Sequence, residues 1–193
     1  MELILNADLP ILINCSYLKK YAAYDIMLKQ GYLYDSELSY NDSRVYIHTD
    51  LNKIVCVFRG TTTFFDWFTD FFCLFGLKRI TPRYYRTIKI INKIKDKYKT
   101  DEIYAVGHSA GGFWCEQSEA TYKITYNKMV ALQDICKIIP ETQKDVREEF
   151  DVVSILELTQ KCEMKETIDI RDLNPLHAHT TEDLIKHRDS ISI

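Results

Sequence analysis

The chain has 193 residues, of which 46% are hydrophobic, and its 25 basic and 28 acidic residues give a net charge of −3. This length suits one domain with a sizeable core, so we treat residues 1–193 as a single domain. The near-neutral, evenly spread charge argues against nucleic-acid binding. No apolar run approaches the roughly 18 residues of a membrane-spanning helix. The first residues lack the basic segment of a secretion signal, so we expect a cytoplasmic protein.

The six cysteines are far apart in the chain, and several lie inside apolar runs such as Val55-Cys56-Val57. This is typical of buried free thiols in a reducing compartment, not of disulfides. No pair has the close Cys-x-x-Cys spacing of a zinc site, and no histidines, cysteines and carboxylates cluster with ligand spacing. We therefore expect no metal and no other cofactor.

The N-terminal third predicts a helix followed by a hairpin. Apolar residues recur at helical spacing within residues 9–30, most clearly over 17–28, and Gly31 is a plausible end. Two β-rich runs, 45–48 and 54–58, are joined by a short polar connection, which is typical of a hairpin. The second run is apolar throughout, which predicts a central strand covered on both faces of the sheet.

The following segments alternate between helical and extended patterns. Residues 82–98 form an amphipathic stripe that predicts a helix, and 103–106 read as a buried strand. A second helix is predicted over 112–123, with further strands at 128–132 and 152–156. Strands that alternate with helices predict an α/β fold with a mostly parallel central sheet flanked by helices.

The most informative motif is Gly-x-Ser-x-Gly at residues 107–111, between the predicted strand and helix. In this setting the motif is typical of a nucleophile elbow, a tight strand-to-helix turn with a serine at its tip. The turn strains the backbone of Ser109 and brings Gly107 and Gly111, which lack a Cβ, close together. It also aims the first N–H groups of the helix at a reacting carbonyl. Ser109 is the predicted nucleophile.

A serine hydroxyl needs a base, usually a histidine that is oriented by a carboxylate. On this kind of scaffold the acid and then the histidine follow the serine along the chain. Only His177, His179 and His187 come after Ser109, and spacing alone does not choose among them.

Two motifs together resemble the class 3 lipases, the fungal-type triacylglycerol lipase family. The first is the apolar run that ends in Arg59-Gly60-Thr61 and is followed by Asp66-Trp67 and Asp70, and the second is the Gly-His-Ser-x-Gly-Gly elbow at 107–112. The motifs span residues 55–112, with Ala110 where leucine is usual in the family. The resemblance implies an α/β-hydrolase-like fold.

The resemblance also implies an oxyanion hole. Its two donors are the backbone N–H of Ala110 and the residue after the Arg-Gly pair, Thr61. Each such donor contributes roughly 3 kcal/mol to stabilising the transition state. Arg59 and Asp66 are interpreted as supports of this loop, and His108 inside the elbow is interpreted as structural.

The same resemblance suggests the remaining catalytic residues. Asp151, which precedes an apolar run and a serine, matches the family's acid, with Asp134 as the rival and Asp169 as a third choice. For the base, the segment Asn174-Pro175-Leu176-His177-Ala178-His179 resembles a tail in which the later histidine is catalytic. His179 is therefore the expected base, with His177 second.

The function implied is that of an enzyme that cleaves carboxylic esters of lipids through Ser109, Asp151, His179 and an acyl-enzyme. The substrate is a lipid or a small ester, and transient contact with a membrane surface fits this activity. The aromatic segment 64–77 is interpreted either as core or as an acyl-chain pocket or interfacial surface. Two alternatives stay open: a thioesterase or peptidase on the same scaffold, and a non-catalytic relative that binds or scaffolds. Oligomeric state is left open.

Overall fold

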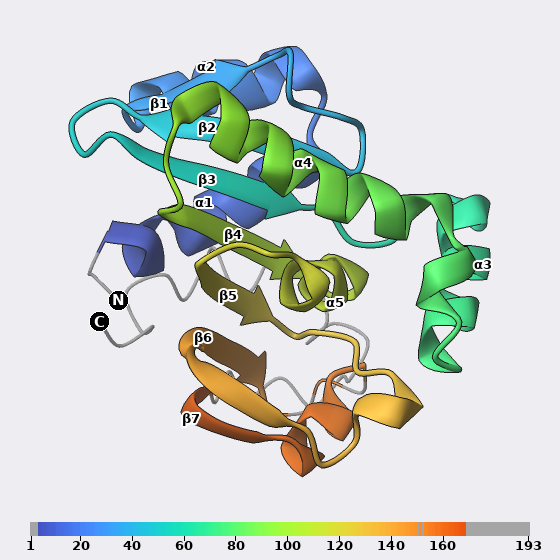
Figure 1. Ribbon diagram of the computed structural model, residues 1–193. Coiled ribbons are helices and arrows are strands. Elements are labelled where there is room, and N and C mark those ends of the chain that lie inside the picture. Colours follow the sequence, from blue (N-terminus) through green and yellow to red (C-terminus); the bar gives the residue numbers. More distant parts are fainter. Residues whose placement is uncertain (1–3, 150, 152, 169–193) are drawn as a thin grey trace.

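The computed structural model describes residues 4–149, 151 and 153–168, and these form a mixed α/β fold around one sheet (Figure 1). The strands lie in the sheet in the order in which they occur in the chain. The first three pair antiparallel, and all pairs from β3 to β7 are parallel. The strands are β1 (Tyr32–Asp35), β2 (Ser43–His48), β3 (Lys53–Phe58), β4 (Ile103–His108), β5 (Tyr122–Tyr126), β6 (Ile138–Glu148) and β7 (Lys161–Ile168). The predicted mostly parallel sheet is confirmed.

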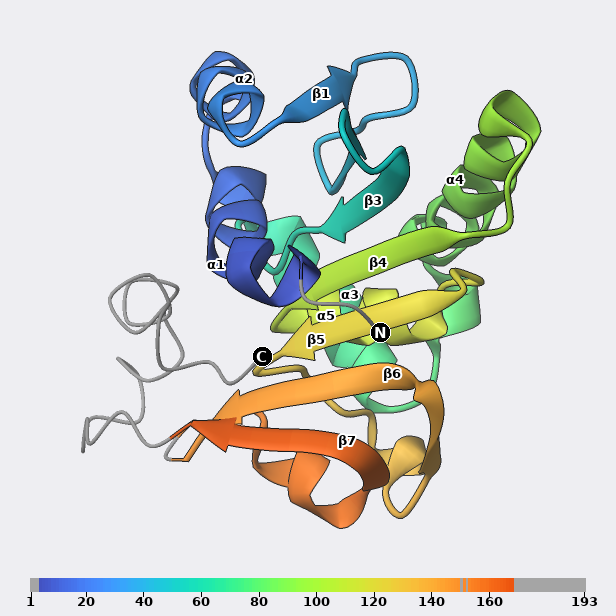
Figure 2. The ribbon, with the colours of Figure 1, turned by 90° about the vertical axis from the view of Figure 1, so that its left-hand side faces the viewer.

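Helices cover both faces of the sheet. Two helices lie on one face, and the other face carries α4 and α5, as Figure 2 shows. The α-helices are α1 (Ile4–Tyr17), α2 (Lys20–Lys29), α3 (Phe64–Leu74), α4 (Pro82–Tyr98) and α5 (Ala110–Gln117). The described connections contain three short 3-10 helices: η1 (Lys78–Ile80), η2 (Leu132–Asp134) and η3 (Ile155–Thr159).

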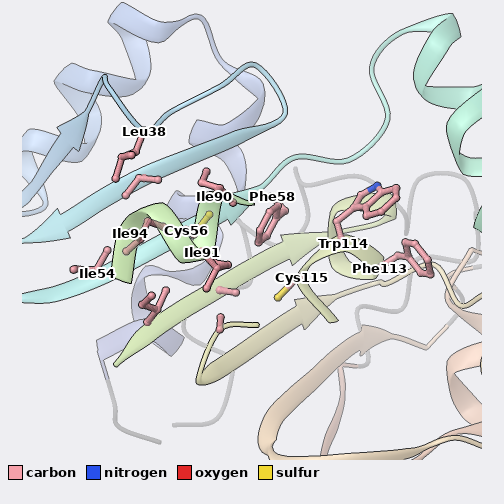
Figure 3. Close-up of a cluster of buried hydrophobic side chains, with 14 of the residues drawn as sticks. Leu38, Ile54, Cys56, Phe58, Ile90, Ile91, Ile94, Phe113, Trp114 and Cys115 are labelled. Carbon is pink, nitrogen blue, oxygen red and sulfur yellow. The ribbon is translucent and has the colours of Figure 1, made fainter. Parts of the chain in front are cut away.

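Strand β3 is buried on both faces, as its apolar sequence predicts. Its side chains alternate, so Val55 and Val57 pack in the cluster that contains α1 residues. On the opposite face Cys56 and Phe58 pack with residues of α4 and α5 (Figure 3). Because β3 and its neighbour β4 are enclosed from both sides, the ends of these two strands are held firmly in place.

The predicted helix over residues 82–98 is confirmed as α4. Thr81 caps it by accepting a hydrogen bond from the backbone N–H of Tyr84, and Pro82 fits the first turn, where no N–H partner is needed. Its apolar stripe buries Ile90, Ile91 and Ile94 against the sheet (Figure 3). Lys99, with φ 53°, adopts the left-handed conformation that ends the helix.

The single helix predicted within residues 9–30 is two helices. Lys19 has an extended backbone, with ψ 148°, and separates α1 from α2. The guanidinium of Arg44 donates to the carbonyls of Cys15 and Leu18, which lie at the end of α1. The break depends on this partner from β2, which the periodicity of the helical segment does not reveal. The predicted end at Gly31, φ 79°, is confirmed.

The helix predicted over 112–123 is wrong at its C-terminal end. Helix α5 stops at Gln117, and Tyr122–Tyr126 forms β5 beside β4. The alternation of Tyr122, Ile124 and Tyr126 with polar residues is a strand pattern. The strand predicted at 128–132 is also wrong, because those residues lead out of β5 into η2.

The strand predicted at 152–156 is wrong in its described part, since residues 153–154 are bends and η3 starts at Ile155. The strands in this region are β6 and β7, neither of which was predicted. Four of the buried positions of β6 are polar, Gln143, Asp145, Arg147 and Glu148, so the strand lacks the usual apolar alternation.

Gln143 and Asp145 belong to a buried ionic cluster centred on Lys128. The Lys128 ammonium lies 2.7 Å from Glu116 Oε2 on α5 and 2.6 Å from Asp145 Oδ2 on β6. Thr125 and Gln143 each donate to Asp145 Oδ1 at 2.7 Å. Burial raises the pKa of Glu116, but Lys128 and a second lysine outweigh it and lower the pKa to about 2. The cluster ties α5 to β6.

Glu157 of η3 lies beside this cluster and is fully buried. Neither of its carboxyl oxygens has a hydrogen-bond partner among the described residues. Burial and the negative charge of Asp145 raise the pKa of Glu157 to about 8, against the smaller opposing effect of nearby lysines and an arginine. Glu157 is therefore protonated at neutral pH.

Candidate active site

Ser109 occupies a strained turn between β4 and α5. Its backbone angles, φ 58° and ψ −128°, lie outside the regions that L-residues normally populate. The Ser109 N–H donates to the Tyr126 carbonyl at 3.0 Å, and the Ser109 carbonyl accepts from Gly112 and Met129 at 2.9 and 3.1 Å. The neighbouring strand and helix thus hold the strained conformation, and Ser109 remains partly exposed.

The flanking glycines are required by contact distances. A Cβ on Gly107 would lie 2.2 Å from the Gly111 carbonyl oxygen, and a Cβ on Gly111 would lie 2.1 Å from the Phe58 oxygen. Both contacts are with backbone atoms, which cannot swing away. The predicted close approach of Gly107 and Gly111 is confirmed, and α5 is also shown to press against the end of β3.

The loop after β3 lies directly against the elbow. A Cβ on Gly60 would be 3.3 Å from Ser109 Cβ and 2.9 Å from the His108 carbonyl oxygen. The Tyr17 hydroxyl accepts from the Gly60 N–H at 3.0 Å and lies 2.8 Å from His108 Nδ1. Tyr17 thus connects the loop to the elbow.

His108 and Tyr17 are both well suited to a structural role. Burial raises the pKa of Tyr17 to about 12, so its hydroxyl stays protonated and can donate. The His108 ring is nearly buried and stacks on Tyr126 with centroids 5.6 Å apart. This buried position at the end of β4, against a residue of β5, agrees with the interpretation of His108 as structural.

Thr61 lies one residue beyond Gly60, and its side chain is fixed by α3. The Thr61 hydroxyl donates to Asp70 Oδ2. Burial raises the pKa of Asp70 in spite of this hydrogen bond and the nearby positive charge of Arg83. Asp70 Oδ1 is buried without a partner among the described residues. Asp70 of α3 therefore holds the Thr61 side chain in place.

Asp66 holds the remaining part of this loop. Its Oδ2 accepts from the N–H groups of Thr62 and Thr63 at 2.9 and 3.0 Å, and Thr63 caps α3 in return. Burial raises the pKa of Asp66, but these N–H groups outweigh it and leave the pKa below its ordinary value. The Arg59 guanidinium is 3.9 Å from Asp66. Both residues support the loop, as predicted.

Ala110 is the first residue of α5, directly after Ser109. Its backbone N–H belongs to the first helical turn, where no carbonyl one turn earlier is available to accept it. The loop that contains Thr61 also meets the elbow, through the contact of Gly60 with Ser109.

Asp151 follows the carboxyl end of β6, the second strand beyond β4. Asn127, after β5, accepts from the Glu148 N–H at 2.8 Å, and the Glu148 carbonyl accepts from the Asp151 N–H at 3.3 Å. The buried Asp151 carboxylate accepts from the N–H groups of Val153 and Ser154, both at 3.0 Å. Asp151 therefore lies at the edge of the sheet where Ser109 lies.

The rival acid, Asp134, lies elsewhere. It ends η2, on the connection that returns from β5 to the start of β6, and lines a surface groove with residues of η1. Asp169, His177, His179 and His187 lie outside the described residues. The structure thus brings Ser109, the Thr61 loop and Asp151 to one edge of the sheet. Asp134 lies on the connection from β5 to the start of β6.

Three residues near the elbow were not assigned a role from the sequence. Tyr17 carried no signal, because it lies 91 positions from its partner His108. Asp70 lies four residues after Asp66, a spacing that puts both on one helix face. Arg83 donates to the Arg59 carbonyl and lies 5.5 Å from the Trp114 ring. The sequence did not single it out, because a basic residue in an amphipathic helix is expected on the solvent-facing side.

Within the described part of the chain, no helix is long and apolar enough to cross a membrane. The same residues contain no group of three or more histidine, cysteine, aspartate or glutamate side chains placed to hold a metal ion. All six cysteines are free thiols. Comparison of the chain with protein-family models and with curated proteins gave no match.

Proposed function

We propose that the protein is a serine hydrolase that cleaves carboxylic esters of lipids, with Ser109 as its nucleophile. The observation that carries the proposal is the strained, glycine-enclosed conformation of Ser109 at the junction of β4 and α5, with the Gly60–Thr61 loop packed against it. Strain of this kind persists only where the surroundings enforce it, and it is concentrated at functional sites.

The proposed reaction assigns a role to each group at this edge of the sheet. The Ser109 hydroxyl attacks the ester carbonyl and transfers its proton to a base, for which His179 is the choice and His177 the rival. The oxygen that gains charge accepts hydrogen bonds from the Ala110 N–H and from Thr61. The base returns the proton to the leaving alcohol, and water then hydrolyses the acyl-enzyme.

Asp151 is the proposed acid that orients the base. Its two hydrogen bonds from backbone N–H groups, at 3.0 Å each, fix the position of the carboxylate. A buried carboxylate at the end of the second strand after the nucleophile supports this role, and the position of Asp134 argues against the rival choice.

The lipid nature of the substrate is supported by α3, which follows the Thr61 loop. Phe68, Phe71 and Phe75 lie three and four residues apart, so they share one face, and their exposed fractions are 53%, 60% and 55%. These three side chains are on the surface and not in the core. An exposed aromatic stripe on the segment that follows the Thr61 loop is suited to contact with acyl chains or a lipid surface.

The decisive experiment is labelling with a fluorophosphonate probe, which reacts covalently with activated serines. We expect wild-type protein to be labelled and to hydrolyse p-nitrophenyl esters. Ser109→Ala should keep the circular dichroism spectrum of the wild type and lose both reactions. Ser36→Ala, at an exposed serine on a loop, is the matched control and should retain them. Absence of labelling in the wild type would instead favour the non-catalytic binding alternative.

A further inference from the structure

A basic groove lies next to the candidate active site. Its volume is about 570 Å³, and it is formed by the end of α1, the start of α2, the connection from β1 to β2, and Arg59. Four of the lining residues are basic and none is acidic; the basic residues are Lys19, Lys20, Arg44 and Arg59. This local excess of positive charge contrasts with the net charge of −3 of the chain.

The positive charges of the groove are largely uncompensated. Lys19 and Lys20 are exposed, and no described carboxylate lies within 4 Å of either ammonium. Arg44 is buried and donates to the backbone carbonyls of α1, which do not neutralise its charge. Among the described carboxylates, Arg59 has only Asp66 within 4 Å, at 3.9 Å. Such a concentration of charge attracts anions.

Hydrogen-bond donors accompany these charges. Tyrosine side chains, among them Tyr21 and Tyr34, line the same groove. The Lys20 ammonium lies 5.2 Å from the centre of the Tyr34 ring, which holds it at the groove wall. The start of α2 has neither a capping side chain nor an acidic residue in its first turn, so its dipole adds to the positive potential.

The groove is continuous with the loop that touches the nucleophile. Tyr17 lines it, and the hydroxyl of that residue accepts from the Gly60 N–H at 3.0 Å. Gly60 in turn contacts the elbow, since its Cβ position is 3.3 Å from Ser109 Cβ. The groove and Ser109 are therefore connected through Tyr17 and Gly60.

We propose that this groove binds the phosphate group of the substrate, so that the substrate class is a phosphate-bearing lipid ester. The proposal rests on the proposed function and specifies its substrate. A phosphate carries up to two charges and several acceptor oxygens, which matches a wall of arginine, lysine and tyrosine donors. The aromatic face of α3 and the basic groove then serve the two ends of one amphipathic molecule.

The test compares dihexanoylphosphatidic acid with dihexanoylglycerol, both as monomers in solution, because these two esters differ only by the phosphate. We expect wild-type protein to prefer the phosphate-bearing ester. In the variant Lys19→Gln with Lys20→Gln, the ratio of kcat/KM for the two esters should fall at least tenfold. The control variant, Lys29→Gln with Lys89→Gln, changes the net charge equally at exposed sites outside the groove and should keep the ratio.

A second arm separates the groove from catalysis. Binding of inorganic phosphate and of glycerol 3-phosphate is measured by calorimetry on Ser109→Ala protein with and without the two groove substitutions. Both anions should bind, at least fivefold more weakly in the variant. Loss of phosphate binding with an unchanged ester ratio would assign the groove to free phosphate and overturn the substrate class. Unchanged binding and ratio would overturn the proposal entirely. If neither ester is hydrolysed, the proposed hydrolase function is refuted. The calorimetric measurement then still shows whether the groove binds phosphate.

Discussion

Glu157 makes the stability of the protein depend on pH in an unusual direction. Its carboxyl is fully buried, has no hydrogen-bond partner among the described residues, and has a pKa of about 8 in place of the ordinary 4.5. Between these two values the folded state keeps a proton that the unfolded state has lost. Raising the pH across this window therefore lowers the free energy of unfolding.

The size of the effect follows from the shift. Each pKa unit corresponds to about 1.4 kcal/mol, so moving from pH 5 to pH 8 should cost the wild type about 3–4 kcal/mol through this one group. The variant Glu157→Gln keeps the shape of the side chain and cannot ionise. Its stability should be close to that of the wild type at pH 5 and higher by about 3–4 kcal/mol at pH 8.

The assay is urea unfolding at half-unit steps from pH 5 to pH 8 for both proteins. The difference between the two free energies of unfolding isolates Glu157, since all other titrating groups are common to both. Parallel curves across the whole range would refute the reasoning, and would mean that the Glu157 carboxyl is solvated or ion-paired.

Three further outcomes are expected. Gly111→Ala places a Cβ 2.1 Å from a backbone oxygen, so thermal melting should show a loss of more than about 2 kcal/mol. Tyr17→Phe removes the hydroxyl that joins the loop to the elbow, and steady-state kinetics should show kcat lowered about tenfold with KM little changed, while Tyr24→Phe on exposed α2 has no effect. His179→Ala should lower kcat/KM by about 10⁴-fold and His177→Ala by little, as for loss of one triad member.

Each of these has a clear contrary result. A melting temperature unchanged by Gly111→Ala would contradict the close contact of α5 with the end of β3. An increase in KM alone for Tyr17→Phe would make Tyr17 a substrate contact and not a positioning residue. If the two histidine variants behave in the reverse order, His177 is the base, and if neither matters, the base is elsewhere.

The sequence was most informative where local pattern and tertiary contact agree. The apolar run at 54–58 and the amphipathic stripe at 82–98 became β3 and α4, because both bury the surface that their periodicity marks. The glycine-flanked Ser109 was predictable because the turn itself demands those residues. The contact of Gly60 with the elbow agrees with the expected pairing of the two motifs.

The prediction failed where distant partners decide the structure. The end of α1 depends on Arg44, and β6 is a strand with buried polar residues because Lys128 and Thr125 meet them. No periodicity within one segment records such pairings. The role of Tyr17 was missed for the same reason, as its hydroxyl acts between two loops that are far away in the chain.

The order of the strands has a consequence for the time course of synthesis. Since each strand pairs with the next one along the chain, the sheet can be assembled from the N-terminus as the ribosome releases it, without threading a later strand between earlier ones. The hydrogen bonds that hold the Ser109 backbone come from Tyr126 and Met129, however, which are translated after the elbow. A nascent chain can therefore have β1 to β4 in place before the hydrogen bonds that hold the Ser109 backbone can form, and these form only when β5 and the residues after it have been released.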